Sequence, residues 1–467
     1  RDAVPDVARL GAEADQLLEV GVVRGPGLHG MVTEADPGRD PYTTSAEEAR
    51  ANCHVRPELG SWVDLCLVVG GMVPSPLEVD PAMVGMDAEA LAEVDSILLT
   101  ALADSASPGV AIAVGRHGKL ARLRGYGVLD WDEEARPATP ASIWDMASVT
   151  KVSTTTTAAM ILAEAGRLEL DSPVVSYLPW WSAGDPRKND VTVRQLLIHR
   201  GGLPPFIRFY ESVKGRQAFQ DTIGGLALQY APGDSTVYSD IGMVTVAFIV
   251  EEITGTNLND FMASRVWDGL GMQDTGFNPE PALLPRIAPT EVDDYFRFTH
   301  VHGVVHDENA FALGGVAGHA GLFSSARDLA VFAQTLLDGG TALPCTGGPG
   351  TGIPCSAPRP GPFRIAAPTS VELFTRRHDE TASRAIGWDT SSEGASSGDY
   401  LSPRAFGHTG FTGTSFWVDP ELDLFVVLLT SRTNPTRTNG KHVPLRRAVH
   451  DAVARAVADR VVQRREW

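Results

Sequence analysis

The sequence lacks a hydrophobic segment long enough to cross a membrane. Its longest apolar run, residues 62–74, contains Asp64 and is shorter than the roughly 20 apolar residues that a transmembrane helix needs. We therefore predict no transmembrane helix. The chain also does not open with a basic stretch followed by an apolar one, so we expect any export signal to lie outside this sequence.

An excess of positive charge is also missing. The 467 residues include 39 Lys and Arg against 58 Asp and Glu, which gives a formal net charge of -19. Proteins whose main partner is nucleic acid or an anionic membrane surface carry the opposite balance of charge. We therefore expect no nucleic-acid partner.

Cysteine is scarce, and its four residues fall into two local pairs, Cys53 with Cys66 and Cys345 with Cys355. Two local disulfides would be typical of an exported protein, whereas four free thiols of a cytoplasmic enzyme are the alternative. Neither pair has the C-x2-C spacing of a zinc site, so the sequence predicts no cysteine-bound zinc.

The length exceeds what one small hydrophobic core accommodates. Residues 1–84 form an N-terminal extension without a predicted role, in which residues 4–22 have the spacing of an amphipathic helix. Residues 85–467 are predicted to form the main domain. Within it, residues 343–362 are rich in Gly and Pro and are expected to be a surface loop.

Both ends of the main domain combine a hairpin with a helix. Near the start, a helix precedes a hairpin that turns near Gly118; near the end, a hairpin that turns at Pro420 and Glu421 precedes a helix. Each hairpin needs partner strands and a covering helix. The sequence therefore predicts an α+β fold, with one antiparallel sheet flanked by N- and C-terminal helices and a large, mostly helical insert over roughly residues 145–395.

Four helices are expected inside this range, and the last has Ser325 and Asp328 as a capping pair. They cover residues 193–199, 241–254, 258–267 and 325–338. Because pockets often form where two subdomains meet, we expect a cleft between the insert and the sheet.

Three separated motifs carry residues suited to catalysis. "SVTK" places Ser148 and Lys151 three residues apart at the start of a helix, where they share one face. "VYSDIG" holds Tyr238 and Asp240, and "GHTGFTGTS" begins with Gly407 and His408. A hydroxyl nucleophile needs a nearby base and oxyanion donors, and free N–H groups at a helix start can supply the donors. Ordinary helix capping by the serine, with a solvated lysine, is the alternative.

Together these motifs resemble those of the serine penicillin-recognising family, which includes class C β-lactamases, penicillin-binding proteins, DD-peptidases and carboxylesterases. The family pattern is S-x-x-K, Y-x-N and K-T-G or H-T-G, and the resemblance covers about residues 86–462. It includes "LLIHRGGLP" and "GGVAGHAGLFSSARDLA". The resemblance implies a β-lactamase/transpeptidase-like fold without a cofactor.

The resemblance also implies a role for each residue of the motifs. Ser148 would be the acylated nucleophile, Lys151 its proton partner and Tyr238 a general base or acid. The N–H groups of Ser148 and Phe411 would form an oxyanion hole. The substrate would be bound by Asp240, His408, Thr409, Gly410 and Phe411, with Gly410 leaving room for the substrate backbone beside the strand.

Two positions need separate interpretation. His408 stands where many β-lactamases have Lys, so the site lacks the fixed cation that would bind a substrate carboxylate and lower the pKa of Tyr238. Asp240 stands where the family has Asn, and an ionised carboxylate accepts hydrogen bonds but donates none. Asp240 either pairs with Lys151 or only caps the helix that follows it.

The sequence thus predicts an exported, metal-independent serine hydrolase of the cell envelope or periplasm, acting through an acyl-enzyme on D-alanyl peptide amides or small esters. The alternatives are a β-lactamase, a non-catalytic penicillin-binding-type protein and a zinc-dependent hydrolase. The zinc alternative rests on one stretch that contains His300, His302, His306, Asp307 and Glu308. No oligomeric state is predicted.

Overall fold

The computed structural model describes residues 72–348, 350–352, 354–378 and 382–466. The predicted helix over residues 4–22 and the cysteines Cys53 and Cys66 lie outside the described residues. Among the described residues, no single helix is long and apolar enough to cross a membrane. The helical segments Asp240–Thr254 and Leu258–Leu270 reach that length and hydropathy only when taken together, and the chain bends by 71° between them.

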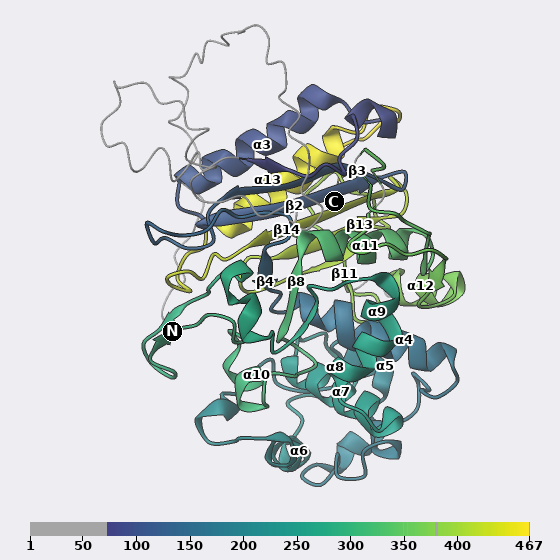
Figure 1. Cartoon of the computed structure of the whole chain (residues 1–467). Helices are drawn as coiled ribbons and strands as arrows, with labels where there is room; N and C mark the ends of the chain where they lie inside the picture. The colour runs from purple at the N-terminus through teal and green to yellow at the C-terminus, as the bar shows by residue number, and fades with distance from the viewer. Residues whose placement is uncertain (1–71, 349, 353, 379–381, 467) are drawn as a thin grey trace, which may run out of the picture. The chain divides into compact units, whose positions relative to one another are not determined.

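A seven-stranded sheet forms the framework (Figure 1). In spatial order its strands are β1 (Val73–Pro74), β3 (Lys119–Gly127), β2 (Gly109–Arg116), β14 (Leu424–Thr430), β13 (Ser415–Asp419), β12 (Phe406–Thr409) and β11 (Asp389–Thr390). Every pair of neighbours is antiparallel. The two predicted hairpins meet where β2 pairs with β14, so the predicted antiparallel sheet of an α+β fold is confirmed.

Side chains of β2 alternate between the two faces of this sheet, as the period of a strand requires. On β2, Val110 and Ile112 pack in one hydrophobic cluster and Ala111 and Ala113 in another. The first cluster includes the buried residues of α3 (Ala88–Ala103) and α13 (His442–Arg455), so the N- and C-terminal helices cover the same face (Figure 1).

The opposite face is covered by α11 (Ala326–Leu337), which packs on β14 and β2. This part of the range expected for the helical insert therefore belongs with the sheet. Ser325 caps α11, because its hydroxyl accepts a hydrogen bond from the Asp328 N–H at 3.2 Å. The Asp328 carboxylate instead accepts from the Asp274 N–H and the Thr275 hydroxyl, both at 2.8 Å, so only half of the predicted capping pair forms.

Most of the regular secondary structure in the rest of the insert is helical, as predicted. Its helices are η2 (Lys151–Thr156), α4 (Thr157–Glu164), α5 (Val193–Leu197), α6 (Arg216–Gly225), α7 (Asp240–Thr254), α8 (Leu258–Met262), η6 (Ala263–Trp267), α9 (Asp268–Leu270), α10 (Glu308–Ala312) and α12 (Pro368–Thr375). Short 3-10 turns are η1 (Pro81–Val84), η3 (Val174–Ser176), η4 (Pro186–Asp190), η5 (Phe209–Glu211) and η7 (Pro281–Arg286). The helix expected over residues 258–267 changes after Met262 to the π-helical η6.

Three small sheets complete the framework. The first has three strands in the order β4 (Ile143–Asp145), β8 (Leu322–Ser325) and β5 (Gly276–Phe277). The others pair β6 (Val292–Asp293) with β7 (Thr299–His300) and β9 (Thr341–Ala342) with β10 (Phe363–Arg364). The first matters for function, because β4 leads directly into the segment that contains Ser148.

The predicted surface loop over residues 343–362 is closed by a disulfide between Cys345 and Cys355, one of the two pairs expected. The loop is also fastened to the start of β3. The Leu120 N–H donates to the Gly352 carbonyl at 2.7 Å, and the Lys119 ammonium donates to the Thr351 carbonyl at 3.1 Å.

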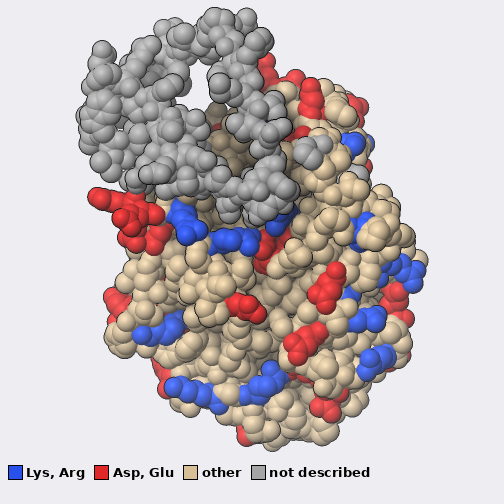
Figure 2. Space-filling view, viewed as in Figure 1, with Lys and Arg blue, Asp and Glu red and all other residues tan. Residues whose placement is uncertain are grey.

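On the face shown in Figure 2, basic and acidic side chains are interspersed over the described residues.

Asp328 generates a prediction about stability. Its carboxyl is fully buried, and burial, reinforced by the negative charge of Asp274, raises its pKa to about 6. A raised pKa means that the folded state favours the protonated form of Asp328. The contribution of this residue to the free energy of unfolding is therefore complete below about pH 4 and is lost as the pH rises toward 6. We expect Asp328→Asn, which keeps the acceptor oxygen, to gain on the wild type over this window by about 1 to 3 kcal/mol.

Urea unfolding of both proteins between pH 4 and 8 measures the difference. Asp132→Asn, which changes an exposed carboxylate, is the control. A difference between Asp328→Asn and the wild type that does not vary with pH would contradict the assignment.

Candidate active site

Ser148 lies on a tight turn between β4 and η2. The Asp145 carboxylate at the end of β4 accepts the Ala147 N–H at 2.8 Å and the His306 N–H at 2.7 Å. Ala147 itself has a positive φ of 45°, which few residues other than glycine adopt. The turn that carries the predicted nucleophile is therefore held by hydrogen bonds to the buried Asp145.

Lys151 lies one turn further along and is fully buried. Its ammonium donates to the Ser148 hydroxyl at 2.8 Å and to the His319 carbonyl at 3.0 Å, and it lies 2.8 Å from the Asp240 carboxylate. Burial, the largest single effect, would lower the pKa of Lys151, but the contributions of Asp240 and, to a smaller extent, Tyr238 together outweigh it, and the pKa is raised. Lys151 is therefore a charged ammonium.

Asp240 is the first residue of α7. The helix is capped by the preceding residue, Ser239, whose hydroxyl accepts from the Gly242 N–H. The alternative in which Asp240 only caps the helix is therefore wrong. Its carboxylate instead forms the ion pair with Lys151, and its side chain is 21% exposed.

The Tyr238 ring lies against the Lys151 ammonium, which is 4.9 Å from the ring centroid. Burial raises the pKa of the Tyr238 phenol, and the negative charge of Asp240 raises it further. The positive charge of Lys151 opposes this rise in the pKa without cancelling it. The structure thus brings the phenol, the ammonium and the Ser148 hydroxyl together.

His199 is a residue that the sequence analysis did not identify. It lies within "LLIHRGGLP", and its ring centroid is 4.6 Å from that of Tyr238. Its Nδ1 accepts the Ser239 N–H at 3.2 Å, and burial lowers its pKa, helped by the charges of Arg384 and Lys151. A buried, neutral imidazole therefore forms one wall beside the phenol; its position within a resembling stretch was the only sequence signal.

His408, on β12, has its ring centroid 5.8 Å from that of Tyr238. Its Nδ1–H donates to the backbone carbonyl of Thr409, the last and half-buried residue of the strand. Burial lowers the pKa of His408 far below its usual range, and the nearby positive charge of Arg384 adds to the effect. His408 therefore provides no cation at neutral pH.

Arg384 supplies a cation at this place and was also missed from the sequence. Its guanidinium carbon lies 5.3 Å from the Tyr238 ring centroid. The side chain is 17% exposed, and its nearest carboxylate among the described residues, that of Asp389, is 3.7 Å away. No periodic pattern or motif marks this arginine.

Gly410 and the residues after it form a turn, residues 410–414, that packs on the nucleophile segment. A Cβ on Gly410 would lie 2.1 Å from the Thr414 hydroxyl and 2.4 Å from the Met146 carbonyl. The requirement for glycine therefore comes from packing inside the protein, whereas the sequence analysis attributed it to room for substrate. The hydroxyls of Thr412 and Thr414 donate to the carbonyls of Asp145 and Met146 at 2.7 and 3.0 Å.

This packing places the two predicted oxyanion donors on adjoining segments. Among the described residues, neither the Ser148 N–H nor the Phe411 N–H donates to another protein group. The Phe411 side chain is 48% exposed and packs against the His306 ring, with 5.6 Å between centroids.

The five residues of the zinc alternative point to different partners. The His302 ring donates a hydrogen bond to the carbonyls of Leu284 and Ile287. His306 pairs with Glu291, Asp307 with His319, and Glu308 with Arg437. The His300 ring lies 3.9 Å from the Asp130 carboxylate. Within the part of the chain that the structure describes, no group of three or more His, Cys, Asp or Glu side chains is arranged to hold a metal ion.

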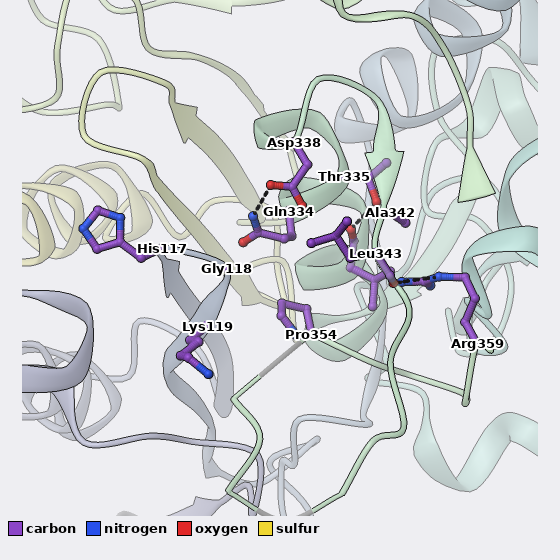
Figure 3. A pocket seen from close by; sticks show the side chains of 11 residues that line it. His117, Gly118, Lys119, Gln334, Thr335, Asp338, Ala342, Leu343, Pro354 and Arg359 are labelled. Carbon is purple, nitrogen blue, oxygen red and sulfur yellow. Dashed lines mark hydrogen bonds between the residues drawn. The ribbon is translucent and has the colours of Figure 1, made fainter. Parts of the chain in front are cut away.

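A separate cavity of about 240 Å³ lies beside the disulfide-closed loop (Figure 3). The turn between β2 and β3, the C-terminal half of α11 and the loop itself line it, with His117, Lys119, Gln334, Asp338, Pro354 and Arg359 among the lining residues. None of the predicted site residues lines this cavity.

Comparison with known proteins agrees with the motifs. The β-lactamase family profile matches residues 94–451, a range that contains all three motifs. A protein of Escherichia coli O157:H7 named "Putative D-alanyl-D-alanine carboxypeptidase" is 30% identical over 401 residues, which cover 79% of this chain and 88% of that protein.

Two solved structures show the same fold. A penicillin-binding protein homologue from Caulobacter crescentus has a TM-score of 0.59 at 17% identity, covering 79% of this chain and 99% of the other. A class C β-lactamase from Rhodobacter sphaeroides has a TM-score of 0.59 at 20% identity, covering 79% and 100%. The predicted β-lactamase/transpeptidase-like fold is thereby confirmed, and the protein belongs to the β-lactamase family.

Proposed function

We propose that this protein is a metal-independent serine hydrolase that works through an acyl-enzyme on Ser148. The observation that carries the proposal is the 2.8 Å hydrogen bond from the buried Lys151 ammonium to the Ser148 hydroxyl, with Tyr238 beside both. A serine hydroxyl becomes a useful nucleophile when a neighbouring group can take its proton. A solvated lysine next to a capping serine would not need to be buried and paired in this way.

The charged state of Lys151 decides which group takes the proton. An ammonium has no lone pair and cannot act as a base, whereas the phenolate of Tyr238 can. In the proposed reaction, the phenolate form of Tyr238, a minor form at neutral pH because the pKa of the phenol is raised, accepts the Ser148 proton as Oγ bonds to the substrate carbonyl carbon, and the Lys151 ammonium stabilises that phenolate. Tyr238 then protonates the leaving group. In the second half, a water gives a proton to Tyr238 as the water oxygen bonds to the acyl carbon, and Tyr238 returns that proton to Ser148 Oγ as the acyl group is released.

Two backbone N–H groups would donate hydrogen bonds to the substrate oxygen and so stabilise the negative charge that develops on it. Those of Ser148 and Phe411 have no other acceptor among the described residues. Donors fixed before the reaction lower the barrier, because they need no reorganisation when the oxyanion forms.

For the substrate, we favour D-alanyl peptides with a free terminal carboxylate. Arg384 offers a cation beside Tyr238, and its only described carboxylate partner is distant at 3.7 Å. The name of the curated relative agrees with this class. Small esters are the second candidate, because Asp240 cannot donate a hydrogen bond to a peptide carbonyl as the family's Asn would.

We also propose that the protein works outside the cytoplasm, in the cell envelope. The Cys345–Cys355 disulfide supports this location, because structural disulfides persist in oxidising compartments.

Ser148→Ala should abolish covalent labelling by a fluorophosphonate and lower ester hydrolysis by at least about 10³-fold, because it removes the nucleophile. Ser153→Ala, which changes a buried serine of the helix η2 that follows Ser148, is the matched control and should label like the wild type. Labelling detected by in-gel fluorescence on the Ser148→Ala protein, with its circular dichroism unchanged, would rule out Ser148.

Asp240→Asn should move the rising limb of the pH profile of kcat/KM to lower pH by about one unit, because Asp240 raises the pKa of both Lys151 and Tyr238. Hydrolysis of p-nitrophenyl acetate between pH 6 and 10 measures the limb. Asp260→Asn, whose carboxylate accepts from Asn257 and Asn259, is the control. An unmoved limb would mean that neither group titrates in catalysis.

Arg384→Gln should raise KM for a D-alanyl-D-alanine peptide by about 10- to 100-fold, the usual effect of losing one charge-assisted hydrogen bond. The same peptide with its terminal carboxylate amidated should be hydrolysed equally by the variant and the wild type. Arg404→Gln, which removes an exposed positive charge paired with Glu372, is the control. If Arg384→Gln discriminates between the two peptides as the wild type does, Arg384 does not bind the carboxylate.

A further inference from the structure

Two buried arginines lie against the turn formed by residues 410–414. Arg446, on α13, donates to the carbonyls of Gly413 at 3.2 Å and Thr414 at 2.8 Å, and also to that of Gly410. Arg432, just after β14, donates to the Phe411 carbonyl at 2.7 Å. Four of the five carbonyls of the turn are therefore held by these two guanidinium groups.

Both arginines are unusual in their surroundings. Each is only 6% exposed, and neither forms an ion pair with a carboxylate of the described residues. Burial lowers the pKa of Arg446 to about 9, with the neighbouring charge of Arg432 adding to the effect, so the group is still charged at neutral pH. Burying an unpaired charge is expensive, and packing alone would be served better by an apolar side chain.

The bonds to the carbonyls also set the direction of one N–H group. The carbonyl of Gly410 and the N–H of Phe411 belong to the same planar trans peptide and point in opposite directions. Because Arg446 holds the Gly410 carbonyl, the Phe411 N–H points away from Arg446. The neighbouring Phe411 carbonyl is fixed by Arg432, whose guanidinium carbon lies 4.1 Å from the Phe411 ring centroid.

We propose that Arg446 and Arg432 are positioning residues that aim the Phe411 N–H at the substrate oxygen and place positive charge behind the turn. This inference rests on the proposed function, since it assigns a role in stabilising the oxyanion. An oxyanion gains from nearby positive charge in a buried setting far more than the neutral ground-state carbonyl does. The two arginines therefore act on the transition state and hardly on the binding of substrate.

The test compares Arg446→Met with the wild type on a p-nitrophenyl ester and on an alkyl boronic acid, whose adduct with a serine carries a negatively charged oxygen. We expect kcat to fall by about 10- to 100-fold, somewhat less than for the removal of one oxyanion donor. The boronate affinity should fall in parallel, and KM should change by less than threefold.

Arg359→Met is the matched control. Arg359 is also a buried arginine that donates to backbone carbonyls, those of Leu343 and Leu270, but it belongs to the disulfide-closed loop. The control should lower the melting temperature while leaving kcat and boronate affinity within twofold of the wild type. If Arg359→Met lowers kcat as much as Arg446→Met does, the loss of kcat comes from general destabilisation of the protein, and the inference is overturned.

Arg432→Met and Arg446→Lys secure the test if Arg446→Met does not fold. Arg432→Met should show the same selective loss of kcat and boronate affinity. Arg446→Lys keeps the charge but has one donor group in place of a fork, so it should recover part of the loss. Folded variants whose kcat and boronate affinity match those of the wild type would overturn this inference and leave the proposed function standing. If the wild type does not react with a fluorophosphonate, the proposed function itself is overturned.

Discussion

The ammonium of Lys151 is fully buried, and the architecture of the site follows from the need to stabilise it. A charge out of water requires a counter-charge and hydrogen-bond acceptors, and without them the amine would lose its proton. Three chain segments meet this need: Ser148 from the turn before η2, Asp240 from the start of α7, and the His319 carbonyl from the segment before β8. Each of these contacts is also a constraint on where its segment lies.

The constraint extends outward from the ammonium through a second layer of contacts. The ring of His319 pairs with Asp307 at 2.9 Å, and Asp307 caps α10 by accepting the Ala310 N–H. The residue before Asp307, His306, donates its N–H to Asp145, which holds the nucleophile turn. The stretch that suggested a zinc site in the sequence therefore connects the segment of His319, which contacts the Lys151 ammonium, to the turn that carries Ser148.

The sequence predicted those features that depend on local periodicity or on spacing within one segment. The two hairpins, each with an adjoining helix, predicted the sheet, and the spacing of Ser148 and Lys151 predicted their contact. It could not choose between the two interpretations of Asp240, because Ser239 and Asp240 are both good capping residues. Only the structure shows that Ser239 caps α7 and leaves Asp240 to pair with Lys151.

The residues that were missed share a different property. His199, Arg384 and Arg446 are polar side chains brought to the site by tertiary packing, and none belongs to a local pattern that indicates burial. Gly410 was identified for another reason than the one observed, because its close neighbour, the Met146 carbonyl, is distant in the sequence. Contacts of this kind become visible only once the segments are assembled.

The pairing of β2 with β14 has a consequence for how the protein is made. The centre of the sheet joins a strand near the start of the described chain to one close to its end, and α13, which follows β14, completes the layer over it. On the ribosome, the segment with Ser148 and Lys151 therefore emerges long before the strand and helix that it must pack against. Such long-range pairing delays folding until the chain is nearly complete, so an interrupted translation product would carry the serine without the sheet that organises its surroundings.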